Sequence, residues 1–323
     1  MQCHTPLGGQ KRAKQVNADE ALGALLALDE LVMVLPGART PETIRASAAV
    51  KPQRSTKWWT ASWSRERAVV AREEPGITLL MGVQGAGTTT EALRTSLTRL
   101  NRDVEGGTLK SLHARLEAAL ARGERGFVLD NTYVTRAQRH DVLRLGEKYG
   151  QAVHGRWFEI EQAEAQVNIV TRALEVHGRL LEPEEHRRGQ TPDSLGPTAH
   201  FRTWKMLERP EVDEGFTTLE TVRFDRRPWP DGRAALFVGV DKLDAIPETD
   251  ALIIVVGWKE GGLLTPHVSF VCPHPAGPPT CWCRPPLPGL FLAAARAHGV
   301  SLAKSRLLTD NGALRATSAS PRS

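Results

Sequence analysis

The feature that most constrains this chain is a glycine-rich turn at residues 82–89, which directly follows the apolar run 77–81. An unbroken apolar run of this length is typical of a buried parallel strand. The residues after the turn, 91–94, are compatible with a helix. In a strand–turn–helix unit of this kind, glycines let backbone N–H groups curl around a phosphate, and the start of the helix adds a favourable field. The alternative is an ordinary glycine turn of an α/β protein.

The spacing of the turn fits the P-loop pattern G-x-x-x-x-G-K-[ST] at every required position except the lysine, where Thr88 stands. Gly82, Gly85 and Gly87 provide the turn, and Thr89 provides the hydroxyl that holds Mg²⁺ in such loops. A lysine would place positive charge on the transferring phosphates, which a threonine cannot do. The turn therefore predicts a site for ATP and Mg²⁺ that lacks one cation.

Length, charge and the distribution of apolar residues limit the class of protein. The chain has 323 residues, enough for two domains with a core in each. Its net charge of +5, from 42 basic and 37 acidic residues, permits a nucleic-acid partner without requiring one. Residues 1–14 contain no apolar signal core, and no apolar run reaches the length of a membrane span. We therefore expect a cytoplasmic protein without a membrane segment, and the oligomeric state stays open.

Strand-like and helix-like segments alternate after the glycine-rich turn. Apolar runs predict strands at 127–129 and 153–160, and apolar residues at helical spacing predict helices at 108–121, 135–149 and 161–177. Such alternation is typical of a parallel sheet with helices on both faces. Ligands of these folds bind at the carboxyl ends of the strands. We expect the site residues at such places: the glycine-rich turn and the pair Asp130-Asn131 follow predicted strands, and Asp103 is placed at a similar strand end.

Three further motifs give the first half of the chain a family resemblance. The segments LNRD at 100–103, VLDNTYVTRAQR at 128–139 and LERPEVDEGF at 207–216 resemble, in this order, the kinase domain of polynucleotide kinase–phosphatases. The resemblance covers about residues 70–226. It implies a 5′-hydroxyl kinase that uses ATP and acts on single-stranded or broken-end nucleic acid, with Asp103 as the general base. A carboxylate near the attacking oxygen suits phosphoryl transfer. The alternative for Asp103 is an acid ahead of the helix at 108–121.

The same resemblance suggests roles for four other residues. Asp130 and Asn131 match the D-N-T segment of the family, or form a strand-to-helix turn in which both residue types are common. Asn168 and Arg172 are matched to an R-N-x-x-R segment whose last arginine clamps a phosphate, although its first arginine is Val167 here and Arg172 stands one residue beyond the last position. Arg172 is therefore a candidate for holding the phosphates, and the alternative is an exposed helix arginine.

Residues 1–69 form a polar and basic extension. An amphipathic pattern at 19–34 predicts a helix that ends at a Pro-Gly pair. Trp58, Trp59 and Trp63 stand among lysines and arginines. Aromatic rings mixed with cations can stack on bases and hold phosphates. The alternative is that these tryptophans pack against the neighbouring domain, as buried tryptophans commonly do.

Three of the four cysteines of the chain lie close together near its C-terminal end. With His274 they form two clips, Cys272-x-His274 and Cys281-x-Cys283. Four soft or borderline ligands at this spacing suit tetrahedral Zn²⁺. In a cytoplasmic chain such clustering favours a metal site over disulfides, and the alternative is free thiols. Because four protein ligands leave no open position, we expect a structural zinc.

The segment around these cysteines resembles the zinc-containing branch of the haloacid-dehalogenase phosphatases, as in heptose-bisphosphate phosphatases. The resemblance covers about residues 233–318 and implies a smaller α/β domain. The D-x-D-G loop of that family reads Gly239-Val240-Asp241-Lys242 here, and Pro285 replaces a lysine. Since aspartyl-phosphate chemistry requires the missing nucleophile, we expect a scaffold without phosphatase activity.

The predicted chain is α/β with three parts: the extension at 1–69, a P-loop NTPase-like kinase domain with a parallel sheet at 70–227, and a reduced haloacid-dehalogenase-like domain with a zinc staple at 228–323. The leading hypothesis is a kinase of polynucleotide 5′-hydroxyl type. The alternative, because both catalytic sites carry losses, is a nucleotide- or nucleic-acid-binding pseudoenzyme.

Overall fold

The structure is a computed structural model that describes residues 61–65, 76–188, 192–226 and 231–319. The helix expected at 19–34, together with Trp58 and Trp59, lies outside the described residues. Trp63 lies in a described strand, without a described side chain. Within the described part of the chain, no helix is long and apolar enough to cross a membrane.

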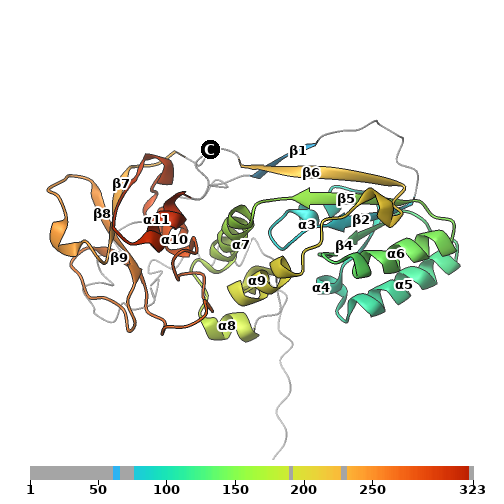
Figure 1. Ribbon diagram of the computed structural model, residues 1–323, viewed down its shortest axis with the longest axis horizontal. Coiled ribbons are helices and arrows are strands. Elements are labelled where there is room, and N and C mark those ends of the chain that lie inside the picture. Colours follow the sequence, from blue (N-terminus) through green and yellow to red (C-terminus); the bar gives the residue numbers. More distant parts are fainter. Residues whose placement is uncertain (1–60, 66–75, 189–191, 227–230, 320–323) are drawn as a thin grey trace, which may run out of the picture.

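The first half of the chain alternates strands and helices (Figure 1). Its strands are β1 (Ala61–Arg65), β2 (Ile77–Met81), β3 (Thr98–Leu100), β4 (Phe127–Asp130), β5 (Val153–Glu159) and β6 (Thr218–Arg226). Its helices are α3 (Thr88–Ala92), α4 (Arg102–Glu105), α5 (Leu109–Ala121), α6 (Arg136–Lys148), α7 (Gln162–His177), α8 (Pro183–Arg188) and α9 (Pro197–Lys205), with short turns η1 (Pro192–Ser194) and η2 (Val212–Glu214).

These strands form one sheet in the order β1-β6-β5-β2-β4-β3. All neighbours are parallel except β1, which runs antiparallel to β6 along the edge. Residues 61–65, which the sequence analysis assigned to the extension, are thus an edge strand of the first sheet. The parallel order places the carboxyl ends of β2, β3 and β4 next to one another.

Side chains of β2 alternate between two apolar layers, because successive residues of a strand point to opposite faces. Ile77, Leu79 and Met81 lie in the core that contains the apolar residues of α5 and α6. Leu80 lies in the opposite core with Ala165 of α7. Both faces are therefore covered, as expected for a parallel sheet.

The second half of the chain forms its own parallel sheet, in the order β10-β7-β8-β9. Its elements are β7 (Ala235–Gly239), η3 (Leu243–Ala245), β8 (Leu252–Trp258), β9 (Val268–Cys272), α10 (Gly289–His298), η4 (Leu302–Lys304), β10 (Arg306–Leu308) and α11 (Gly312–Ala319). The fold is therefore α/β with two parallel sheets.

Helix α7 joins the two halves (Figure 1). Its residues Val167, Ile169, Val170 and Leu174 are buried in one core with the sheet residues and α10 of the second half, whereas Ala165 belongs to the first half. One face of α7 is thus a wall of the second core.

Candidate functional site

The glycine-rich turn has a conformation that only glycine adopts readily at two positions. Gly85 and Gly87 have φ angles of +87° and +98°. A Cβ atom on Gly85 would lie 2.5 Å from the carbonyl oxygen of Ala165 on α7, so the loop also presses against that helix. Strand β2 ends at Met81 and α3 begins at Thr88, so the predicted strand–turn–helix unit is present.

Thr89 faces a buried carboxylate on the neighbouring strand. Its Oγ1 donates a hydrogen bond of 3.3 Å to Oδ1 of Asp130, which ends β4 and is 1% exposed. Strands β2 and β4 are paired in parallel, so both residues arise at the same edge of the sheet. A hydroxyl and a carboxylate are oxygen ligands of the kind that Mg²⁺ takes in phosphate-transfer sites.

The other oxygen of Asp130 carries two further donors that sequence reasoning missed. Nη2 of Arg99 lies 2.5 Å and Nδ2 of Asn101 3.0 Å from Oδ2. Asn101 also donates to the backbone carbonyl of Asp130 at 2.6 Å. Arg99 lies on β3 opposite Val128 of β4, a pairing that the sequence did not reveal. The cation Arg99 therefore lies beside Asp130, the carboxylate that contacts Thr89 of the glycine-rich turn, although position 88 carries no cation.

Asp103 lies in the first turn of α4, two residues after the buried Asn101 that caps this helix. Its side chain is exposed and lies 3.7 Å from the guanidinium of Arg102. The amide N–H of Arg102 donates to Oδ1 of Asn131 at 3.1 Å, so Asn131 fixes the start of α4. The structure thus presents the Asp103 carboxylate to solvent near the carboxyl ends of β3 and β4.

Arg172 lies on α7 and interacts with charges from two other segments. Burial lowers the pKa of its guanidinium, while the carboxylates of Asp193 and Asp103 act in the opposite direction. Asp103 and Arg172 are therefore close enough for their charges to interact. Val167, which stands where the resemblance places the first arginine, is five residues before Arg172 and is buried in the core of the second half.

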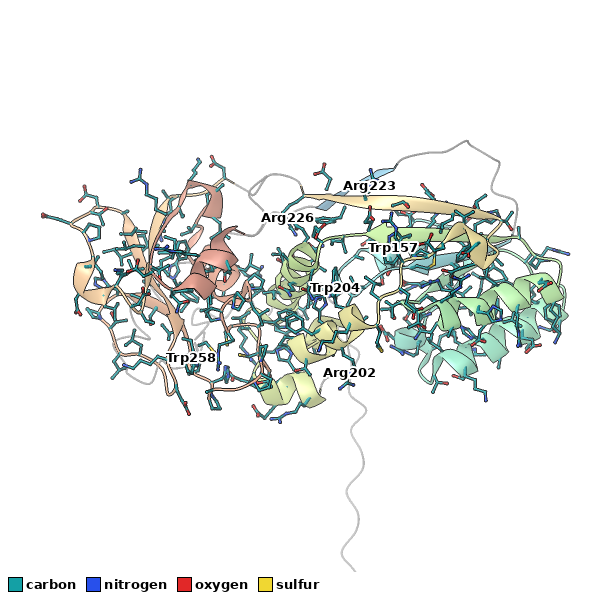
Figure 2. All side chains as sticks on the ribbon, in the orientation of Figure 1. Trp157, Arg202, Trp204, Arg223, Arg226 and Trp258 are labelled. Atoms are coloured by element: carbon teal, nitrogen blue, oxygen red, sulfur yellow. The ribbon has the colours of Figure 1, made fainter. Side chains whose placement is uncertain are left out.

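A buried polar network ties the P-loop to α7 and β6. Nδ2 of Asn168 donates to the carbonyl of Gly85 at 2.8 Å, and Oδ1 of Asn168 accepts from Nη2 of Arg226 at 2.9 Å. Arg226 also forms a buried ion pair with Glu164, and Figure 2 shows it at the end of β6 beside α7. The role of Asn168 in this structure is to hold the loop in place.

Helix α9 contacts the P-loop from another side. Nε2 of Gln84 donates to Oγ1 of Thr203 at 3.0 Å. Trp204, also labelled in Figure 2, packs against the core that contains the loop residues Val83 and Ala86. The loop is thus supported by α7 and α9 as well as by its own sheet.

The residues of the predicted metal site come together. The four ligand atoms of Cys272, His274, Cys281 and Cys283 all lie within 4.8 Å of one another. The sulfurs of Cys272 and Cys281 are 3.8 Å apart, and Nδ1 of His274 lies 3.5 Å from Cys272 Sγ and 3.2 Å from Cys283 Sγ. With Zn–S bonds of about 2.3 Å and Zn–N bonds of about 2.1 Å, a tetrahedral site needs separations of about 3.6–3.8 Å. The cluster therefore fits Zn²⁺.

The loop in which the haloacid-dehalogenase resemblance places the nucleophile lies at the end of β7. Asp241 accepts hydrogen bonds from Thr309 Oγ1 at 2.6 Å and from the amide of Asp310 at 2.7 Å. Burial acts to raise the pKa of Asp241, but these hydrogen bonds and Lys242 outweigh it, so the pKa is below the usual value. A Cβ atom on Gly239 would lie 2.2 Å from Asp241 Oδ1. A side chain at this position therefore requires Asp241 and Thr309 to shift.

Comparison with known proteins gives structural similarity but no match in sequence. No known protein-family profile matches the chain, and no curated protein matches it. Among solved structures, the chain is similar to the crystal structure of Chaetomium thermophilum Kti12 in complex with ADP-AlF3, with a TM-score of 0.35 and 14% sequence identity. The similarity covers 45% of this chain and 87% of that chain.

Proposed function

We propose that residues 82–89 bind ATP with Mg²⁺ and that the first half is a phosphotransferase of polynucleotide 5′-hydroxyl kinase type. The observation that carries the proposal is the contact of 3.3 Å between Thr89 and the buried Asp130, made at the ends of adjacent parallel strands. Bound Mg²⁺ would neutralise charge on the phosphates. The backbone N–H groups of Gly85, Gly87 and their neighbours would hold the phosphate oxygens.

Asp103 is the proposed general base. Its exposed carboxylate takes the proton from the 5′-hydroxyl of a single-stranded or broken nucleic-acid end. The hydroxyl oxygen then bonds to the γ-phosphorus, the bond from that phosphorus to the bridging oxygen breaks, and ADP leaves with the electron pair. Arg172, whose charge interacts with that of Asp103, would stabilise the negative charge on the transferring group.

Arg99 is our candidate for part of the work of the missing lysine. Its guanidinium holds the Asp130 oxygen that faces away from Thr89. When Mg²⁺ binds Asp130, the carboxylate no longer needs this partner, and the guanidinium becomes available to a phosphate oxygen. With Arg99 in this role, the site has a cation although Thr88 carries no charge.

The hydrogen bonds of Asp130 also favour a second function. Both oxygens of Asp130 are satisfied by protein donors, namely Thr89, Arg99 and Asn101. A site that is complete without metal, in a loop without its lysine, suits a nucleotide- or nucleic-acid-binding pseudoenzyme. In either case we propose that the second half is a scaffold that holds zinc, in a cytoplasmic protein whose cysteines stay reduced.

The deciding experiment is transfer of labelled γ-phosphate from ATP to a 5′-hydroxyl oligonucleotide, with DNA and RNA tested in parallel. We expect transfer by the wild type and by Glu124→Ala, which removes an exposed acid paired with Arg122. Asp103→Ala should lose about 10²-fold or more in rate. Retained ATP binding without any transfer by the wild type would favour the pseudoenzyme. Absence of binding to both ATP and the oligonucleotide would exclude both functions.

A further inference from the structure

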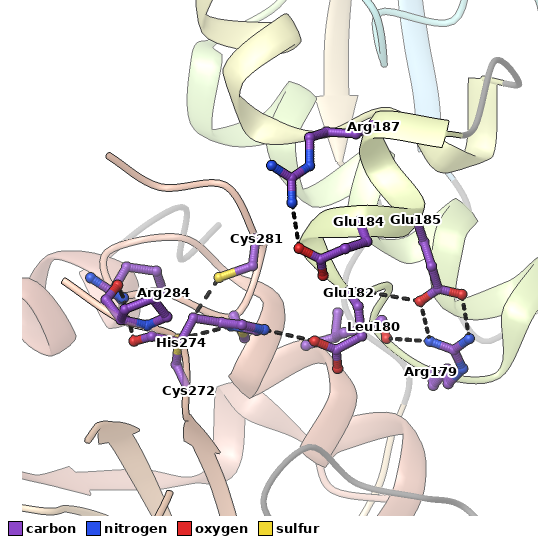
Figure 3. A network of polar contacts seen from close by, with 12 residues as sticks. Arg179, Leu180, Glu182, Glu184, Glu185, Arg187, Cys272, His274, Cys281 and Arg284 are labelled. Carbon is purple, nitrogen blue, oxygen red and sulfur yellow. Dashed lines mark hydrogen bonds and ion pairs between the residues drawn. The ribbon is translucent and has the colours of Figure 1, made fainter. Parts of the chain in front are cut away.

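The metal-site histidine contacts both halves of the chain (Figure 3). Nδ1 of His274 faces the cysteine sulfurs, at 3.2 Å from Cys283 Sγ. On the opposite side of the ring, Nε2 lies 2.7 Å from Oε2 of Glu182. Glu182 comes directly before α8, in the first half, and is 92 residues away in sequence. A ligand of the second half is thus held by a carboxylate of the first half.

Other contacts place the cysteine loop on the same segment. Trp282, between two of the cysteines, is 1% exposed, and its Nε1 donates to the carbonyl of Leu195 at 2.7 Å. Thr198 Oγ1 donates to the carbonyl of Pro279 at 3.3 Å. Leu180 is buried in the core of the second half. Leu180, Glu182, Leu195 and Thr198 therefore belong to the surface on which the metal loop lies.

The same segment leads to the candidate nucleotide site. Glu185 accepts from the amide of Glu182 at 2.8 Å and is paired with Arg179, which follows the end of α7 (Figure 3). His177 at the end of α7 lies 3.2 Å from Asp193, whose charge acts on Arg172. A chain of polar contacts thus runs from the metal ligand His274 to the helix that carries Arg172.

We propose that the Cys₃His centre is an interdomain joint, in which Glu182 positions His274 for the metal and the bound metal in turn orders residues 179–188 and 192–198. A metal-binding imidazole usually donates its second ring N–H to a carboxylate, which fixes its tautomer and orientation. Here that carboxylate is Glu182, which lies in the segment that we propose the metal orders. Metal binding and docking of the two halves are therefore one coupled event. The proposal does not depend on kinase activity.

The first test is metal affinity, measured on the full chain by competition between Zn²⁺ and a chromophoric chelator. Loss of an outer carboxylate of this kind typically weakens metal binding about 10–100-fold, and we expect this for Glu182→Ala. Glu182→Gln, which keeps an oxygen acceptor and the size of the side chain, should retain more affinity. The matched control is Glu184→Ala, because Glu184 is exposed and pairs with Arg187. Equal affinity of Glu182→Ala and Glu184→Ala, or no metal binding at all, would overturn the proposal.

The second test is hydrogen exchange of the full chain before and after zinc removal, which does not depend on whether a variant folds. We expect faster exchange both around the cysteines, at 268–290, and at 179–198, with β2 and β4 unchanged. Readdition of Zn²⁺ should restore protection of both segments together. Faster exchange confined to 268–290 would show that the metal stabilises only the loop that binds it, and the proposal of an interdomain joint would be rejected.

Discussion

The guanidinium of Arg99 lies 2.5 Å from Oδ2 of Asp130, a carboxylate whose Oδ1 accepts from Thr89. One buried carboxylate therefore links the P-loop to a cation on the edge strand β3. In the protein alone, Arg99 neutralises the charge of Asp130. Any Mg²⁺ that binds Asp130 must replace Arg99 as the neutralising cation.

We expect Arg99→Ala to lower the free energy of unfolding by about 3 kcal/mol, because it leaves the charge of Asp130 buried without its cation. Arg94→Ala is the control, since Arg94 is 62% exposed and lies 3.9 Å from its partner Glu91. Its effect should stay below about 1 kcal/mol. Urea denaturation of both variants, with and without Mg²⁺, measures the difference. Mg²⁺ should restore stability to Arg99→Ala, and equal stability of the two variants would contradict the role of the ion pair.

Thr88→Lys restores the charge that the P-loop pattern requires. Because the glycine turn and Thr89 remain in the wild type, ATP binding should be weak but measurable before the change. Loss of a preorganised charge of this kind costs about 10²–10³ in rate, and we expect Thr88→Lys to recover part of it. Single-turnover transfer by the wild type, Thr88→Lys and Thr88→Lys with Asp103→Ala is the measurement. If Thr88→Lys gains nothing while ATP still binds, the kinase hypothesis fails in favour of the pseudoenzyme.

Protein purified without chelators should contain one zinc ion per chain. The four ligand atoms within 4.8 Å of one another are the reason, and Cys281→Ser should abolish binding at stoichiometric metal. Elemental analysis gives the metal content directly. Chelation should lower the melting temperature, because the assembly of the ligands is coupled to folding. A preparation of folded protein without metal would rule out the site.

Gly239→Asp should not create a phosphatase. A Cβ atom at this position would lie 2.2 Å from Asp241 Oδ1 and 2.4 Å from Thr309 Oγ1, so the variant must shift its surroundings. Overpacking of this kind costs about 1–3 kcal/mol. Gly312→Asp is the control, because a Cβ there meets no atom within 4 Å. Thermal melting compares the two variants, and hydrolysis of a 3′-phosphate oligonucleotide that depends on Asp241 would disprove the scaffold assignment.

Acid should destabilise the protein through His200. Burial lowers the pKa of this histidine, which has no exposed surface, to about 4. Since the unfolded chain has a histidine pKa of about 6.5, it takes up the proton first, and stability falls as the pH drops from 6.5 toward 4. The full loss is about 3 kcal/mol. His200→Leu should flatten this dependence in urea titrations at several pH values, and the exposed His140→Leu should not.

The longer elements could be predicted because their signals are local. Helices expected at 108–121 and 135–149 are observed as α5 and α6, and Thr108 and Thr135 cap them through their side chains. The metal residues were predictable for the same reason, since all four lie within one short segment. The strand β3 was not predicted, because three residues with a polar Thr98 and Arg99 do not form an apolar run.

Contacts between distant segments could not be predicted. The pairing of Arg99 with Asp130 depends on β3 lying next to β4, and that of Glu182 with His274 on how the two halves dock. Neither arrangement leaves a pattern in one sequence, because the partners are 31 and 92 residues apart. The sequence therefore indicated the two sites and not the residues that support them.

Helix α7 supplies Val167, Ile169, Val170 and Leu174 to the core of the second half while its Asn168 holds the P-loop. A fragment cut near residue 228 would leave these apolar residues in water, and the remaining fragment would lack one side of its core. The stability of each half therefore depends on the other, whatever the activity of the second half. Truncation at the boundary expected from the sequence should expose the shared core and not separate two independent domains.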